Sequence, residues 1–145
     1  MQAERNTERF TMSQIKSKRR TSSAQFLETA LQIQIATLRR VAKFPKRFTY
    51  LLSVHLTDAA ARGFEQVKKA NSIYPRNKHE VQIRRDCLIK AFAEYQHLIS
   101  QIHVAEEMFD VSENGIIEWM KLINEELALI KGLMDSDTKR YKNLK

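Results

Sequence analysis

The chain has 145 residues, 43 % of them hydrophobic, with only 3 glycines, 2 prolines and a formal net charge of +8. This length suits a single domain, and few helix breakers among many helix-forming residues favour an all-α protein. A single cysteine excludes an intramolecular disulfide. Because no long apolar run or signal-peptide core appears either, we expect a cytoplasmic protein.

The N-terminal residues 1–21 show no apolar periodicity, which predicts a flexible basic arm. The arm ends in three cations, Lys18, Arg19 and Arg20, and we expect them to contact a polyanion. The first helix is expected over residues 23–43. Its core positions by helical spacing are Leu27, Leu31, Leu38 and Val41, and Ala30, Ile33 and Ile35 widen this stripe.

The second helix is expected to begin at Pro45, a good first helical residue, and to end near Tyr74 before a second proline. Its core stripe by spacing is Phe48, Leu52, His55, Leu56, Ala59, Gly63, Val67, Ala70 and Tyr74. A second apolar line runs beside this stripe, at Tyr50, Val54, Ala61 and Phe64. A helix that is apolar over a wide arc covers more than its own domain, so this line predicts an oligomer interface.

The third helix is expected over residues 78–109 and the fourth over 112–134, each with an apolar stripe at intervals of three and four. Residues 22–134 therefore predict an all-α, antiparallel up-down-up-down four-helix bundle. Residues 135–145 would form a basic C-terminal tail.

Positive charge is concentrated in the first half of the chain, where residues 1–76 contain 15 Lys/Arg and 5 Asp/Glu, against 10 and 12 in residues 77–145. Between the first two helices lies a cluster that we term the basic corner, formed by Arg39, Arg40, Lys43, Lys46 and Arg47. No acid lies within ten residues of it on either side. Phosphates would offset the mutual repulsion of these cations, so the corner predicts a nucleic-acid contact.

Other cations have a different sequence context. Four acid–cation pairs are spaced as i,i+4 on the second and third helices, which predicts solvated ion pairs on helix faces. They are Asp58 and Arg62, Glu65 and Lys69, Glu80 and Arg84, and Asp86 and Lys90. Arg85 falls on the core stripe of the third helix. A buried arginine without a partner would be costly, so it is expected to reach the bundle end, pair across an interface or bind an anion.

Residues typical of catalysis or metal binding are sparse. Glu94 and His97 have the spacing of a di-iron ligand pair, but no second Glu-x-x-His motif accompanies them. His55 is expected in the core or in an interface, and Cys87 has no histidine at the spacing of a thiol hydrolase. We therefore expect no enzyme activity, no metal and no cofactor.

A family resemblance covers Phe44 to about Asp137. Its features are Phe44-Pro45-Lys46-Arg47-Phe48 opening the second helix, Lys69-Ala70-Asn71 closing it, Glu106 leading to Ser112, and Leu127, Ile130 and Gly132 near the end. In these features the chain resembles the accessory variability proteins of diversity-generating retroelements, which are related to the four-helix proteins encoded in ribosomal-RNA intervening sequences.

The resemblance implies a non-catalytic protein that assembles into a ring-shaped homo-oligomer, a pentamer in that family. It further implies binding to a reverse transcriptase and to RNA or DNA in template-primed mutagenic cDNA synthesis. Lys46 and Arg47 would then be among the cations that contact nucleic acid. The alternative is a helical adaptor whose basic surface docks on an acidic protein. A peripheral membrane protein is disfavoured, because no wide apolar face adjoins the cations.

Overall fold

The computed structural model describes residues 24–111 and 113–145, and over these residues it is all-helical, with four long helices and no strand. The first helix covers residues 24–41 and is termed the N-terminal helix below. A 3-10 turn, η1 (Lys46–Phe48), and a π-helical segment, η2 (Thr49–Ser53), lead into α2 (Val54–Ser72). The remaining helices are α3 (Lys78–Met108) and α4 (Glu113–Arg140). The all-α prediction is confirmed.

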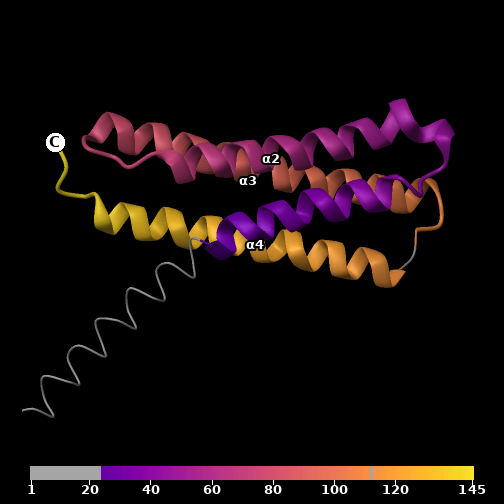
Figure 1. The fold of residues 1–145 in the computed structure, drawn as a ribbon. Coiled ribbons are helices and arrows are strands. Elements are labelled where there is room, and N and C mark those ends of the chain that lie inside the picture. Colours follow the sequence, from indigo (N-terminus) through magenta and orange to yellow (C-terminus); the bar gives the residue numbers. More distant parts are fainter. Residues whose placement is uncertain (1–23, 112) are drawn as a thin grey trace, which may run out of the picture.

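Figure 1 shows α2 and α3 side by side, with the N-terminal helix running alongside α4. A buried hydrogen bond joins these last two, because the indole Nε1 of Trp119 donates to Thr37 Oγ1 at 3.0 Å. The Thr37 hydroxyl in turn donates to the Ile33 carbonyl at 2.7 Å. The largest buried side chain of the core therefore has its polar atom satisfied, as buried polar groups generally require.

The start of α3 is fixed by local capping. The Asn77 side chain accepts a hydrogen bond from the Glu80 amide at 2.9 Å, and the Glu80 carboxylate accepts one from the Arg76 amide at 2.7 Å. Asparagine is among the best N-cap residues, and a glutamate three positions later completes a reciprocal cap. This explains why α3 begins where the sequence predicts.

The end of α4 differs from the expectation. The helix does not stop near Gly132 or Met134 but continues to Arg140, so most of the expected basic tail is helical. A Cβ added to Gly132 would meet no atom within 4 Å, and the residue is exposed. Glycine in an exposed helix position costs only about 1 kcal/mol, which buried contacts on either side, such as those of Ile130, outweigh.

The core stripes of α2, α3 and α4 largely match the spacing in the sequence, whereas that of the N-terminal helix matches only at Ala30 and Ile33. Its buried residues are Phe26, Thr29, Ala30, Ile33 and Thr37. The predicted core residues Leu31 and Leu38 are exposed, Leu38 by 51 %. Of the stripe predicted for the second helix, His55 in α2 and Tyr74, two residues beyond the end of α2, are exposed as well. A pattern based on apolar residues alone does not count a buried threonine, so it did not identify the whole buried face of the N-terminal helix.

One buried ion pair ties three helices together. Arg84 Nε lies 2.6 Å from Asp137 Oδ2, and both side chains are almost fully buried. The same guanidinium donates through Nη1 to the carbonyls of Ala70 and Ile73, at 2.8 and 3.1 Å. Both carbonyls lie at the end of α2, where that of Ala70 also accepts a hydrogen bond from the Ile73 amide at 3.2 Å. Arg84 therefore caps α2 while it joins α3 to α4.

This arrangement corrects two predictions about arginines. Arg84 does not form a solvated pair with Glu80, because its guanidinium is committed to Asp137 and the α2 carbonyls. The buried arginine of α3 is Arg84, and Arg85 beside it is exposed. The spacing placed the core one residue too far along the helix at this point. Of the other predicted pairs, Lys69 and Glu65 are in contact at 3.0 Å.

Candidate nucleic-acid interface

The basic corner lies on the turn between the N-terminal helix and η1. The helix unwinds through hydrogen bonds from the Lys43 amide to the Arg40 carbonyl and from the Phe44 amide to the Val41 carbonyl, both 3.0 Å. Pro45 follows with φ −57°, and it precedes η1 as the corner residue. Local backbone bonding and a fixed proline φ thus define the path of the chain through the cations.

Three aromatic rings anchor this turn to the end of α3. The Phe44 and Phe109 rings meet edge to face at 4.7 Å between centroids, and the Phe48 and Phe109 rings stack at 5.0 Å. Such pairs stabilise a contact beyond the area that they bury. The corner is therefore held from both sides of Pro45 by a shared aromatic partner.

Four of the five corner cations, Arg39, Lys43, Lys46 and Arg47, are exposed. Within the described residues none of these four forms an ion pair, and Arg47 instead lies 4.9 Å over the ring of Phe48. The exposed acids Glu107 and Asp110 flank Phe109 at the same end of the bundle. Because they form no ion pair with the corner, its charge is not neutralised by direct contact.

Arg40 is different, because its side chain turns toward α4. Its Nη2 lies 3.6 Å from Glu118 Oε2, and its guanidinium lies 5.9 Å from the centroid of the Trp119 ring. Its Nε is buried without a partner among the described residues. Arg40 therefore packs the N-terminal helix against α4, and it is less free to contact a ligand than the other four. The sequence could not reveal Glu118 as its partner, since that acid lies far along the chain.

The predicted interface line beside the α2 core is partly exposed. Tyr50 is 87 % exposed, Val54 and Ala61 are exposed, and Phe64 is half-buried. Leu51, which was not in the predicted line, is 74 % exposed. Tyr50 and Leu51 both lie in η2, where the π-helical turn presents two consecutive large apolar side chains to solvent. The remaining predicted contacts, Lys18, Arg19 and Arg20, lie outside the described residues.

The other candidate residues are not brought together. Over residues 24–111 and 113–145, the structure contains no group of three or more His, Cys, Asp or Glu side chains placed to hold a metal ion. His97 is exposed and Glu94 half-buried on α3, and Cys87 is a free thiol. His103 is exposed, and its Nδ1 lies 3.7 Å from Glu106 Oε1.

Two buried polar side chains lie in the core, Tyr95, which the sequence predicts there, and Glu126, which it does not. Glu126 of α4 is 0 % exposed, and neither carboxylate oxygen has a hydrogen-bond partner in the described chain. The Tyr95 hydroxyl of α3 is similarly buried and unpartnered. Burial raises the pKa of Glu126 to about 8, and burial together with the nearby Glu126 charge raises the pKa of Tyr95. The spacing of Glu126 from Ile123 and Ile130 was the signal that could have revealed it.

Room for the Tyr95 ring comes from α2. A Cβ added to Gly63 would lie 2.8 Å from Tyr95 Cε1 and Cζ, closer than real Cβ contacts allow. Gly63 therefore lets the ring lie against the α2 backbone.

Comparisons with protein-family models, with curated proteins and with solved structures find no match to this chain. No helix in the described part is long and apolar enough to cross a bilayer.

Proposed function

We propose that the chain is a non-catalytic, nucleic-acid-binding accessory protein that partners a retroelement reverse transcriptase in mutagenic cDNA synthesis. The observation that carries the proposal is the basic corner, with four exposed cations free of ion pairs on a turn anchored by aromatic rings. The family resemblance supplies the reverse transcriptase.

The proposed architecture is an antiparallel up-down-up-down bundle that assembles into a ring. Contacts between helix ends support the antiparallel part. The start of α3 binds the end of α2 and approaches the end of α4 through Arg84, whereas the other end of α3 stacks on η1 through Phe109. The exposed Tyr50 and Leu51 support a protein contact at η2. A ring would bring several basic corners onto one surface.

Phosphate is the ligand that best fits the corner. Its four exposed cations come from one short stretch of backbone, and this turn is fixed in place by Phe44 and Phe48. Cations that contact phosphates contribute affinity without identifying bases. No aromatic side chain is exposed between the cations for base stacking, since Phe44 and Phe48 both pack on Phe109. Binding should therefore depend steeply on salt and little on sequence.

The test is titration of a labelled single-stranded RNA at several salt concentrations. A quadruple variant in which alanine replaces the four exposed corner cations should bind this RNA more weakly than wild type. Its substitutions are Arg39→Ala, Lys43→Ala, Lys46→Ala and Arg47→Ala. If four phosphate contacts are lost, the slope of log affinity against log salt should fall by about 3. A matched control removes four exposed cations that form no ion pair elsewhere in the described chain, namely Lys68, Lys90, Lys121 and Lys139. Equal loss in both variants would contradict a localised site.

The partner is tested separately. An adjacent reverse-transcriptase gene with a repeat pair is the expected gene neighbourhood, and co-purification with that enzyme should survive nuclease treatment if protein contacts contribute. If all association with partners survives nuclease and the corner variant still binds RNA normally, the adaptor function is favoured instead. Replacing Tyr50 and Leu51 by serine should lower the mass in sedimentation if η2 forms the subunit interface. An unchanged mass would place that interface elsewhere.

A further inference from the structure

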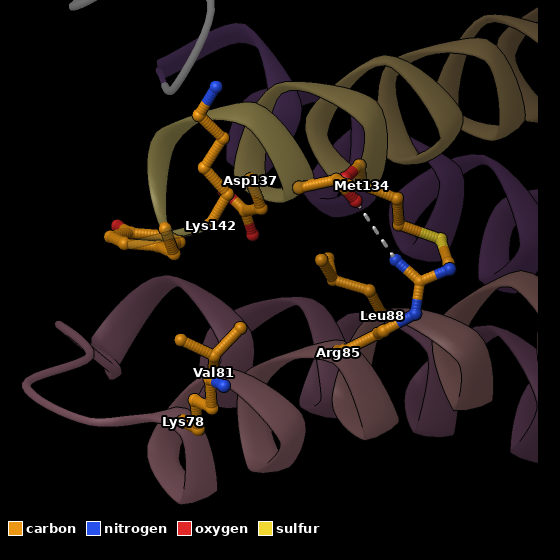
Figure 2. Close-up of a pocket in the computed structure, with 9 residues that line it drawn as sticks. Lys78, Val81, Arg85, Leu88, Met134, Asp137 and Lys142 are labelled. Atoms are coloured by element: carbon orange, nitrogen blue, oxygen red, sulfur yellow. Dashed lines mark hydrogen bonds between the residues drawn. The ribbon is translucent and has the colours of Figure 1, made fainter. Parts of the chain in front are cut away.

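A pocket of about 370 Å³ lies between the first turns of α3 and the last turns of α4. Lys78, Val81, Arg85 and Leu88 form the α3 wall, and Met134 and Thr138 are among the α4 residues that face them. In Figure 2 the Arg85 side chain reaches across from α3 toward α4. The pocket lies at the end of α3 opposite to Phe109 and the basic corner. The 31 residues of α3 separate the two sites by roughly 45 Å at 1.5 Å per residue.

The lining of this pocket is positively charged. It contains three cations, Lys78, Arg85 and Lys142, and none of them forms an ion pair within the described residues. Its one acid, Asp137, is already neutralised from the protein side by Arg84 at 2.6 Å. An anion entering the pocket would therefore meet three uncompensated positive charges without facing a free carboxylate.

The Arg85 guanidinium is the cation best placed to bind such an anion. Its Nη1 donates to Thr138 Oγ1 at 3.5 Å, which is a long hydrogen bond, and it makes no other hydrogen bond in the described chain. The Thr138 hydroxyl itself donates to the Met134 carbonyl at 3.0 Å. Nε and Nη2 of Arg85 remain available, and together they match two oxygens of one phosphate or carboxylate.

The rest of the lining is apolar or aromatic. Val81 and Met134 contribute half-buried aliphatic surface, and Leu88 beside them is fully buried. The ring of Tyr141 also lines the pocket, and the Arg140 guanidinium lies 5.9 Å from its centroid. A free inorganic anion would leave this surface in contact with water. The combination of one guanidinium, two rim lysines and an aliphatic floor matches a ligand with a charged head and a short apolar group.

We propose that this pocket binds a small phosphate monoester that carries an apolar or aromatic group. Three uncompensated cations suit a phosphate monoester, with a charge near −2, better than a carboxylate with −1. At about 370 Å³ the pocket is near the lower end of ligand-site volumes, which limits the apolar part to about one aromatic ring. This site is independent of the proposed nucleic-acid interface, because none of its residues belongs to the basic corner.

The test is an NMR titration of the full ¹⁵N-labelled chain with phenyl phosphate. Amide shifts should change over residues 78–88 and 134–142, with a dissociation constant on the order of 1 mM or below. Three control probes each lack one feature of phenyl phosphate. Inorganic phosphate lacks the apolar group, benzoate lacks the second negative charge, and benzyl alcohol lacks any charge. Each should bind more weakly than phenyl phosphate. Arg85→Gln should weaken phenyl phosphate binding roughly tenfold or more, since a charge-assisted hydrogen-bonding partner is lost.

Arg76→Gln is the matched control, because Arg76 is an exposed cation at the same end of the bundle but outside the pocket lining. It should retain binding. Val81→Thr keeps the shape of the floor but makes it polar, and it should weaken phenyl phosphate more than inorganic phosphate. Circular dichroism would confirm that each variant is folded. Equal weakening by the two arginine variants, unaltered binding in Arg85→Gln, or shifts confined to residues 39–47 would each overturn the proposal.

Discussion

Replacing Glu126 by glutamine should change how the stability of this protein depends on pH. The side chain is fully buried in α4, and both of its carboxylate oxygens lack a hydrogen-bond partner in the described chain. An ionised carboxylate in such a place is strongly disfavoured, so the folded protein keeps the proton. Burial accordingly raises the pKa of Glu126 from 4.5 to about 8. Glutamine has nearly the same shape and does not titrate.

The direction of the effect follows from the protons bound in each state. Between pH 4.5 and about 8 the unfolded chain has lost the Glu126 proton while the folded chain retains it. The folded state binds more protons in this window, so the free energy of unfolding falls as pH rises, by about 1.4 kcal/mol per pH unit. The loss amounts to about 3 kcal/mol at pH 7 and on the order of 5 kcal/mol above pH 8. Below pH 4.5 both states are protonated and the penalty disappears.

Urea denaturation followed by circular dichroism, at intervals from pH 4 to pH 9, measures this dependence. The difference in unfolding free energy between Glu126→Gln and wild type should grow with pH and level off above about 8. Contributions from the histidines and from other acids cancel in this difference. Glu125→Gln is the control, since Glu125 is the exposed neighbour on the same helix. Parallel pH profiles for Glu126→Gln and wild type would refute the reasoning.

Three further changes test the packing of the bundle. Gly63→Ala should lower the free energy of unfolding by about 1–3 kcal/mol, because its Cβ would lie 2.8 Å from the Tyr95 ring. Gly132→Ala should instead raise it by up to about 1 kcal/mol, since nothing lies within 4 Å of the added Cβ. Urea denaturation compares the two, and a loss of stability in both would contradict the assignment of Gly132 to open helix surface. Asp137→Ala should destabilise by about 3–5 kcal/mol, since it leaves a buried guanidinium without its counterion. The exposed Asp135→Ala provides the control, and similar melting temperatures for the two aspartate variants would show that the buried pair contributes little.

Periodicity predicted the helices well where apolar residues occupy the core positions. In α4, Trp119, Ile123, Leu127 and Ile130 repeat at intervals of three and four, and all are buried. In the N-terminal helix the periodicity was right at Ala30 and Ile33 but wrong at Leu31 and Leu38, which are exposed. Thr29 and Thr37 hold core positions there instead. It also failed at Arg84, because adjacent arginines lie only 100° apart on a helix and sequence spacing did not distinguish them.

The candidate site was predictable in its location but not in its detail. A run of cations beside Pro45 indicated an exposed turn, and Arg39, Lys43, Lys46 and Arg47 are exposed there. The partner of Arg40 was not predictable, since Glu118 belongs to a helix that approaches only in the folded state. The same holds for Arg84 and Asp137, which are separated by 53 positions in the chain. The i,i+4 spacing rule identifies pairs within one helix, whereas ion pairs between helices depend on how the helices pack.

The contact between Arg84 and Asp137 also affects how the molecule opens. Helix ends are normally the first parts of a protein to unfold locally, and α4 ends only a few residues beyond Asp137. Here the Arg84 guanidinium at the beginning of α3 binds both the final turns of α4 and the last carbonyls of α2. Unfolding of the first turns of α3 would break all of these bonds, whereas fraying of α2 or α4 would break only the bonds of that helix to Arg84 and leave a buried guanidinium partly unpaired. We therefore expect the opening of α2 and α4 at this end to be coupled through the start of α3, and amide hydrogen exchange of the three segments measures this coupling.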